Sequence, residues 1–497
     1  MMTLTAAASA LPDQNRPASS PPREALERGI AEIFASGAAP GMSVVIVVDT
    51  AVLYVGGFGV ADVATQRPVT PETIFYIASS TKSFTGLASA LLDRAGTLSL
   101  DAPLSRYLPG VTLHPPLSAD SITIRELLTH THGIDNDGPI VFRTAYSGEH
   151  DPGMLERLLA EHEADERGGA FRYGNIGYNV ASLAIDRATG RSWKDVLRSL
   201  VLEPAGMRHT TPYVSRTDPS LLAQPYAPAD TGFDRIPYAK VDGNLHAAGG
   251  LVSTANDMAR WLELNLTDGM LDGRQVFPAE IMREVHRLQV RHADSLDRWP
   301  RHGYAIGWQV GTYAGDTLLH HFGGFPGFDA HVSFMPQRRI GVAVLANGGF
   351  GGGLMDQVSQ YIYDVLAGRV DPQAGATARR SELVERITAA RGRIATNRAE
   401  RRARPQQLPH RLEAYTGTYE SPSYGRMVWT VEKGRLHARI GALASVAETY
   451  DAAANALRVE LIPGSGSTVR FAFEGDRAAS LTWSGTTFER VETRSSR

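Results

Sequence analysis

The chain has 497 residues, of which 43% are hydrophobic and 21% charged, and its formal net charge is −3. This length is too great for one ordinary core, so two domains are expected. The small net charge provides no overall field that would attract nucleic acid or an anionic membrane. The absence of cysteine excludes disulfides, thiolate metal sites and a cysteine nucleophile. No apolar run reaches the roughly 20 residues needed to cross a bilayer.

The first 22 residues are rich in Ala, Ser and Pro. They lack the basic start and the long apolar stretch of a secretory signal, so we predict a disordered tail. This slightly favours a cytoplasmic location over a periplasmic or secreted one. Residues 23–36 predict an amphipathic helix that ends at Gly37.

The next 330 or so residues predict strands at both ends and helices in the middle. A β-branched hairpin is expected over 41–62, and helices over 80–94, 122–130 and 255–266, the last capped by Thr254 or Asn256. Two more strands, 329–336 and 340–347, precede a final helix at 355–368. This order predicts an α+β domain over 23–370, in which both ends build one antiparallel sheet around an inserted helical lobe.

Residues 371–408 form a segment with a different character. Between 379 and 404 they contain nine arginines and three glutamates, and apolar residues recur at 383, 387, 390 and 394. This pattern favours a solvated linker helix. A patch for nucleic acid or lipid is the alternative, which the lack of interleaved aromatic residues weakens.

The last segment, 409–497, alternates apolar and polar residues throughout. Lys433-Gly434 and Gly475-Asp476 are typical of hairpin turns. Short antiparallel strands of this kind predict a small closed β-barrel.

The stretch "FYIASSTKSFTG" (75–86) carries the strongest chemical signal. Ser79 and Lys82 are three residues apart at a helix start, so both side chains lie on one face. A lysine amine with a lowered pKa can remove the proton of a serine hydroxyl, and helix-start amides stabilise the resulting oxyanion. An N-cap serine beside an exposed lysine is the alternative. Only four of the 50 basic residues are lysines, and the neighbours of Lys82 are apolar, which favours a buried lysine.

Two further motifs add polar groups. In "FRYGNIGYN", Tyr173 and Asn175 are two residues apart, so a tyrosine that relays a proton and an amide that holds the lysine can point the same way. In "HHFGGFPGF" (320–328), His321, Gly323 and Gly324 precede a strand, and glycines there allow a substrate to approach the backbone. We expect the amides of Ser79 and Gly324 to form an oxyanion hole.

Together, the three motifs resemble those of the serine hydrolases of the class C β-lactamase and penicillin-binding protein family, S-x-x-K, Y-x-N and K/H-x-G. "ITIRELLTHTHGI", "LEPAGMRHT", "AAGGLVSTANDMARWL" and "GGFPGFDAHVSFMP" also look like family segments, so the resemblance spans roughly residues 25–368. The segment "LEAYTGTYESPSYG" resembles the lipocalin-like barrel of some peptidase and esterase members.

The resemblance implies Ser79 as nucleophile, Lys82 as its partner, Tyr173 as general base with Asn175 orienting it, and His321 in place of the lysine of the third motif. Whether Lys82 or Tyr173 takes the proton stays open. Phe322 stands where the family usually has Ser or Thr, which puts recognition of a substrate carboxylate in doubt. His132 replaces a common serine, and we expect a structural role for it.

We therefore predict a serine hydrolase that cleaves peptide, amide or ester bonds through an acyl-enzyme, with no cofactor and no metal. Its substrate is a small molecule or peptide, and Phe322, Phe325 and Phe328 are expected to form an apolar wall beside Gly323 and Gly324. A DD-peptidase or β-lactamase that acts on penicillins, and a penicillin-binding sensor or scaffold without turnover, are the alternatives. The sequence leaves a homo-oligomer open.

Overall fold

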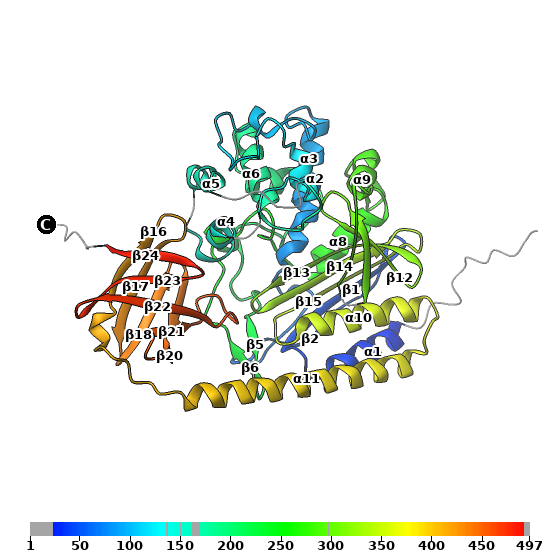
Figure 1. The fold of residues 1–497 in the computed structure, drawn as a ribbon. Coiled ribbons are helices and arrows are strands. Elements are labelled where there is room, and N and C mark those ends of the chain that lie inside the picture. Colours follow the sequence, from blue (N-terminus) through cyan, green and yellow to red (C-terminus); the bar gives the residue numbers. More distant parts are fainter. Residues whose placement is uncertain (1–22, 136–137, 150, 162–168, 297, 492–497) are drawn as a thin grey trace, which may run out of the picture.

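The computed structural model describes residues 23–135, 138–149, 151–161, 169–296 and 298–491. The expected tail at 1–22 lies outside these residues. Figure 1 shows three parts: a large sheet between helices, a long helix beneath it, and a second sheet near the C-terminus. The large sheet and its helices position the candidate site.

The central sheet contains nine antiparallel strands within the described residues. Their spatial order is β10 (Val290–Leu296), β11 (Trp299–Tyr304), β12 (Gln309–Tyr313), β13 (Asp316–Phe325), β14 (Phe328–Met335), β15 (Ile340–Ala346), β1 (Gly41–Val48), β2 (Ala51–Asp62) and β3 (Arg67–Pro68). Because β1 pairs with β15 on one side and β2 on the other, the two ends of this region meet at the centre of the sheet. The expected α+β arrangement is confirmed.

Strand β1 shows why both faces of the sheet are covered. Val45 and Val47 belong to one hydrophobic cluster, and Val44 and Ile46 belong to another. Successive side chains of a strand point to opposite faces, so a nearly continuous apolar run needs a layer on each side.

Helices supply those two layers. α8 (Ala255–Leu266) contacts β1 and β15 from the side of the helical lobe, while α10 (Gly351–Leu366) contacts β14 and β15 from the other side, next to α1 (Arg23–Phe34). The side chain of Thr254 caps α8 by accepting a hydrogen bond from the Asp257 amide. The lobe contains α2 (Thr81–Arg94), α3 (Ile124–Thr129), α4 (Pro139–Phe142), α5 (Pro152–Leu159), α6 (Ile176–Thr189), α7 (Trp193–Leu197) and α9 (Ala279–His286).

The arginine-rich segment contains α11 (Pro372–Ala403). Its first half packs against α1 and α10, and Leu383 and Ile387 are buried there. Its second half reaches the C-terminal sheet, where Arg401 donates to Glu448 at 2.6 and 2.9 Å. Figure 1 shows the helix running along the lower edge of the molecule from the central sheet to the second one.

The second sheet is a nearly closed antiparallel barrel. Nine strands of the described chain lie in the order β19 (Leu443–Val446), β18 (Arg435–Ile440), β17 (Gly425–Glu432), β16 (Gly417–Ser421), β24 (Thr486–Val491), β23 (Arg477–Trp483), β22 (Ser467–Glu474), β21 (Ala456–Val459) and β20 (Glu448–Asp451). Pairing of β16 with β24 joins the first and last strands. The expected closure is incomplete, because β19 and β20 do not pair and form the two edges of the sheet.

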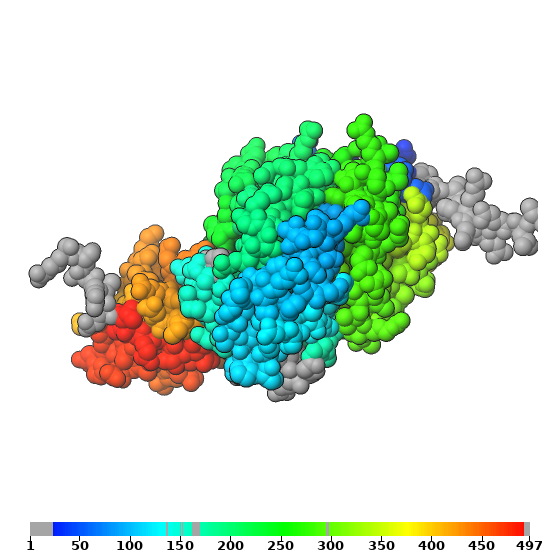
Figure 2. All heavy atoms as spheres, turned by 90° about the horizontal axis from the view of Figure 1, so that it is seen from above, coloured from blue at the N-terminus to red at the C-terminus, as the bar shows by residue number. Residues whose placement is uncertain are grey.

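The barrel packs against the helical lobe through a small aromatic contact. Phe142 is 5% exposed, and its ring lies 5.2 Å from Trp483 and 5.4 Å from Tyr424. The Arg143 guanidinium donates to the Ser423 carbonyl at 3.0 Å. In the view from above, Figure 2 shows the orange and red barrel at one end of the molecule, beside the cyan and green lobe.

Candidate active site

The turn that presents Ser79 is held by hydrogen bonds to two other segments. Ser79 lies in a 3₁₀ turn, Ala78–Ser80, that leads directly into α2. The Ile77 amide donates to the Leu251 carbonyl at 3.0 Å, and the Ser80 hydroxyl donates to the His321 carbonyl at 2.8 Å. Ala78 has a φ of +45°, which an L-residue adopts only at a cost when its surroundings fix it. These bonds fix the turn that carries Ser79.

Lys82 is fully buried, with 0% of its surface exposed. Its Nζ lies 3.2 Å from Ser79 Oγ, 2.8 Å from Asn175 Oδ1 and 2.9 Å from the Ala248 carbonyl oxygen. The predicted serine–lysine contact is therefore present, and the alternative of an exposed lysine at the helix start does not apply.

Burial sets the charge of Lys82. Desolvation lowers the pKa of its amine well below the ordinary value. The acceptors around it are neutral oxygens rather than carboxylates, so they do not restore the full solvation of an ammonium ion. A neutral amine beside a serine hydroxyl can accept the hydroxyl proton.

Tyr173 stands over the same lysine. Lys82 Nζ lies 4.8 Å from the centroid of the Tyr173 ring. The residue as a whole is 38% exposed, but desolvation of its hydroxyl raises its pKa to about 12, and a hydrogen bond with Ser79 opposes this shift only in part. Tyr173 is thus a neutral phenol that touches the serine and is also reachable from outside.

A helix begins directly after the Y-x-N motif. Asn175 is the residue before the first turn of α6, and its Oδ1 accepts from Lys82. Tyr173 lies two residues earlier, on the segment that approaches the helix. The helix start therefore fixes both side chains of the motif around the amine.

His321 lies on β13 and is 2% exposed. Its Nε2 is 3.2 Å from the Tyr304 hydroxyl, its Nδ1 is 3.0 Å from the Phe322 carbonyl, and its ring centroid is 5.9 Å from that of Tyr173. Burial lowers the pKa of His321 well below its ordinary value, and a protonated Lys82 would lower it further. The third motif thus places a neutral imidazole beside Tyr173.

The two glycines of β13 meet the serine turn differently. A Cβ at Gly323 would lie 2.1 Å from the Ile77 carbonyl oxygen and 3.1 Å from the Ser79 nitrogen, so the strand backbone fits tightly against the turn. A Cβ at Gly324 would meet no atom within 4 Å. Gly324 consequently borders open space beside Ser79.

Phe322 does not lie where an apolar wall of the cleft would require it. Its ring stacks between His320 and His331, at 4.3 and 4.5 Å, and packs against the cluster on the α1 and α10 side of the sheet. Leu319, two residues before His321, belongs to the cluster on the opposite side. Because strand side chains alternate, Phe322 faces away from His321, and the expectation that it lines the site is corrected.

Phe325 and Phe328 lie near the serine turn instead. Phe325 makes an edge contact with Tyr76 at 5.1 Å and stacks on Tyr146 at 5.3 Å, and Phe328 lies 6.2 Å from Tyr76. Tyr76 is three residues before Ser79. The Lys240 amine covers the Phe325 ring at 3.4 Å.

Sequence reasoning missed His130, which ends α3 in the left-handed conformation. It is 1% exposed, and its ring lies 4.8 Å from Tyr173 and 4.7 Å from Tyr304. Neither ring nitrogen has a hydrogen-bond partner among the described residues. Burial lowers the pKa of His130 well below the ordinary value, and a protonated Lys82 would lower it further. The only signal was its place in the family-like segment "LLTHTHG".

His132, two residues later, supports the turn after α3. Its Nδ1 accepts from the Ile134 amide at 3.0 Å.

In the described parts of the chain, no three His, Asp or Glu side chains are grouped so as to hold a metal ion. No helix among the described segments combines the length and apolar character needed to cross a membrane.

The chain resembles known proteins in sequence and in fold. The chain is 25% identical over 449 residues to the unguisins hydrolase ungD of Aspergillus violaceofuscus, covering 83% of this chain and 77% of that one. It is 26% identical over 320 residues to the protein flp of Staphylococcus aureus, and this match spans only 60% of the length of flp.

Solved structures share the fold. An octameric penicillin-binding protein homologue from Pyrococcus abyssi superposes with a TM-score of 0.59 at 22% identity, over 93% of this chain and 98% of that one. The D-amino acid amidase of Ochrobactrum anthropi SV3 gives a TM-score of 0.57 at 23% identity, over 69% and 98%. The Beta-lactamase family model matches residues 26–367, more than half of the sequence and the part that contains Ser79, Lys82, Tyr173 and His321. The chain therefore belongs to the Beta-lactamase family.

Proposed function

We propose that the protein is a serine hydrolase that cleaves amide, peptide or ester bonds through an acyl-enzyme on Ser79. The observation that carries this proposal is the buried Lys82 amine, 3.2 Å from Ser79 Oγ and desolvated enough to lower its pKa. A buried lysine without a carboxylate partner destabilises a fold, so its presence beside a serine favours a catalytic role.

In the proposed acylation, Ser79 Oγ attacks the substrate carbonyl carbon and its proton passes to Lys82 Nζ. We assign the proton to Lys82 because the raised pKa of Tyr173, about 12, makes a phenolate scarce at neutral pH. The carbonyl oxygen becomes an oxyanion that accepts hydrogen bonds from the Ser79 and Gly324 amides. Tyr173 then relays a proton to the leaving nitrogen or oxygen, and the C–N or C–O bond breaks.

Deacylation reverses these roles. Water attacks the acyl carbon, and its proton passes to Lys82 by way of the Tyr173 hydroxyl. The bond from the acyl carbon to Ser79 Oγ then breaks, Lys82 returns the proton to Oγ, and the acid departs. Asn175 keeps Lys82 oriented, since its Oδ1 accepts from the amine at 2.8 Å. The His130 and His321 rings lie 4.8 and 5.9 Å from the Tyr173 ring and help to position it as neutral imidazoles.

For the substrate, we propose amides, peptides or esters rather than β-lactams. Position 322 has no hydroxyl to bind a carboxylate, and the Phe322 ring faces the other side of the sheet. Phe325 and Phe328 remain our candidates for an apolar surface near the leaving group. The likeness of the C-terminal barrel to lipocalins remains a proposal, as does assembly into a homo-oligomer, for which the octameric homologue is a precedent.

Adduct mapping tests the mechanism, and a substrate panel tests the class. Intact mass after a fluorophosphonate should show one adduct, which Ser79→Ala abolishes. The panel contains nitrocefin, benzylpenicillin, p-nitrophenyl esters, short peptides, and D- and L-phenylalanine amides. We include the last two because a fold neighbour is a D-amino acid amidase. Nitrocefin turnover far above the other substrates would indicate a β-lactamase, and a permanent penicillin adduct would indicate a sensor.

A further inference from the structure

A large cavity lies away from Ser79. It has a volume of about 1430 Å³ and is bounded by the second half of α11, the hairpin of β5 (Tyr226–Pro228) and β6 (Phe233–Arg235) with the residues after it, and the open seam of the barrel. Ser79, Lys82 and Tyr173 are not among its lining residues. Single small-molecule pockets usually measure about 300–1000 Å³, so this cavity has room for a larger ligand.

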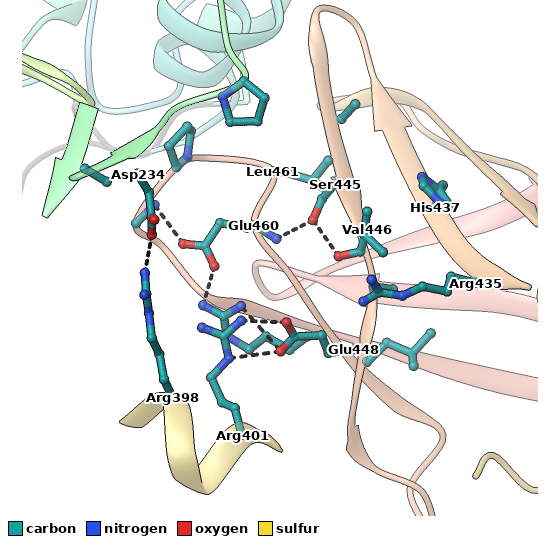
Figure 3. A pocket seen from close by; sticks show the side chains of 18 of the residues that line it. Asp234, Arg398, Arg401, Arg435, His437, Ser445, Val446, Glu448, Glu460 and Leu461 are labelled. Carbon is teal, nitrogen blue, oxygen red and sulfur yellow. Dashed lines mark hydrogen bonds and ion pairs between the residues drawn. The ribbon is translucent and has the colours of Figure 1, made fainter. Parts of the chain in front are cut away.

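Charge distinguishes the cavity from the rest of the molecule. Seven arginines and three acidic residues line it, although the whole chain has a net charge of −3. Figure 3 shows Arg398 paired with Asp234 and Arg401 paired with Glu448, while Arg435 points from the barrel wall. Arg458 pairs with Glu448 and Glu460, and Arg235 donates to the Ile236 carbonyl and to Gln224. The acidic side chains are thus already paired.

Three arginines remain available to a ligand. Arg393, Arg402 and Arg435 form no ion pair with any residue in the described ranges, and all three are exposed. They come from two sides, because Arg393 and Arg402 lie on α11 and Arg435 lies on β18. A guanidinium binds a carboxylate with two parallel hydrogen bonds, so this arrangement favours a carboxylate.

The floor of the cavity is apolar. Leu436, Leu457 and Leu461 are buried members of the barrel core that also line the cavity, and Val446 is 38% exposed within it. An inorganic anion gains nothing from such a floor, whereas apolar side chains do. The ligand therefore combines a carboxylate with several apolar groups.

The strands at the seam favour a peptide. Val446 belongs to β19 and Glu448 belongs to β20, and these two strands are the edges of the barrel sheet. Edge strands expose backbone N–H and C=O groups that pair with an extended chain. Each edge is partly occupied, because Gln406 Oε1 accepts from the Thr449 amide of β20 at 3.4 Å and the Val446 carbonyl of β19 accepts from Ser445 Oγ at 2.9 Å. A peptide would pair with the groups of these edges that remain.

We propose that this cavity, the seam site, binds the C-terminal end of a short apolar peptide, with the free α-carboxylate held by Arg435 from the barrel and by either Arg393 or Arg402 from α11. The proposal does not rest on the proposed hydrolysis, because binding is measured with a Ser79→Ala chain. Tyr238 connects the two regions, since it lines the seam site and its ring lies 5.8 Å from Phe325.

The test compares three probes on the full-length Ser79→Ala protein by fluorescence polarisation and calorimetry. They are a labelled pentapeptide of alternating leucine and valine with a free carboxylate, the same peptide as its C-terminal amide, and palmitate. We expect the peptide with the free carboxylate to bind at least about tenfold more tightly than its amide. Added salt should weaken the binding of the peptide with the free carboxylate. Equal binding of acid and amide, no binding, or binding of palmitate alone would overturn the proposal.

Substitutions locate the binding. The triple variant Arg393→Gln/Arg402→Gln/Arg435→Gln should lose at least about tenfold in affinity for the acid and little for the amide. Arg380→Gln changes an exposed arginine of α11 that does not line the cavity, and it should change either affinity less than about twofold. Val446→Glu adds a negative charge to the floor and should abolish binding of the acid. Unchanged binding in the triple variant or in Val446→Glu would place the peptide elsewhere.

Discussion

At the scale of single residues, Lys82 and Tyr173 divide the proton chemistry between them. Burial lowers the pKa of Lys82 and desolvation raises that of Tyr173 to about 12. We predict that kcat/KM rises with pH along one ascending limb. Its midpoint should lie below 10.5, the ordinary pKa of a lysine amine, because burial lowers the pKa of Lys82. Tyr173→Phe should lower kcat by about 10²–10⁴ without moving that limb. A limb that disappears in Tyr173→Phe would assign the base to the tyrosine instead.

The buried amine also makes stability depend on pH. The folded chain has the lower Lys82 pKa, so between the two pKa values the unfolded chain binds more protons and the free energy of unfolding rises with pH. Urea unfolding at about pH 7 and pH 9.5 should therefore show wild type gaining stability relative to Lys82→Met. Lys433→Met, at an exposed turn, is the control and should show no such gain. A pH-independent difference for Lys82→Met would contradict the shift.

At the scale of elements, the contact between β13 and the serine turn sets the geometry. Gly323→Ala would place a Cβ 2.1 Å from the Ile77 carbonyl oxygen, and Gly324→Ala would place one in open space. We predict that Gly323→Ala lowers the free energy of unfolding by about 1–3 kcal/mol and reduces kcat by displacing the Ser79 amide. Gly324→Ala, its matched control, should stay within about 0.5 kcal/mol. Thermal unfolding measures the stability of the two variants, and acyl-enzyme kinetics measure their activity. If Gly323→Ala and Gly324→Ala are equally stable, β13 and the serine turn are packed less tightly than the structure indicates.

At the scale of the whole molecule, the barrel packs against the segment of the helical lobe that contains Phe142 and Tyr146. This segment also contacts β13, the strand that carries His321. Phe142 packs on Trp483, and four residues later Tyr146 stacks on Phe325. We predict that Phe142→Ala costs about 3 kcal/mol and lowers activity, because it leaves a cavity at the contact between barrel and lobe. Val428→Ala, on the outer barrel surface at 37% exposure, should change neither. If Phe142→Ala keeps full activity in denaturant-free buffer, the barrel does not support the site.

Local patterns predicted much of this architecture. The hairpin of β1 and β2, the helices α2 and α8, and the alternation of the C-terminal strands follow from period and turn chemistry, which act over a few residues. The side of Phe322 was also predictable in principle. Its position next to His321 on a strand places the two side chains on opposite faces, and the expectation of an apolar wall overlooked this.

Other features have no local signal. The Ala248 carbonyl reaches Lys82 across 166 residues of sequence, and His130 meets Tyr173 only because α3 and α6 pack together. The gap between β19 and β20 forms the seam site. It depends on how the nine strands of the barrel pair and curve, which leaves these two strands as unpaired edges. Such contacts are set by the packing of whole elements, and a short stretch of sequence does not encode that packing on its own.

The sequence by itself determined the chemistry available to this protein: a serine and a lysine on one helix face, a tyrosine before an asparagine, and a histidine with two glycines on a strand. These follow from residue type and spacing. Only the tertiary structure decided which of them meet, how deeply Lys82 is buried, and what packs on the face of the sheet that holds Phe322. Distances between segments and the loss of water around a charge arise when the sheet and its helices close over one another.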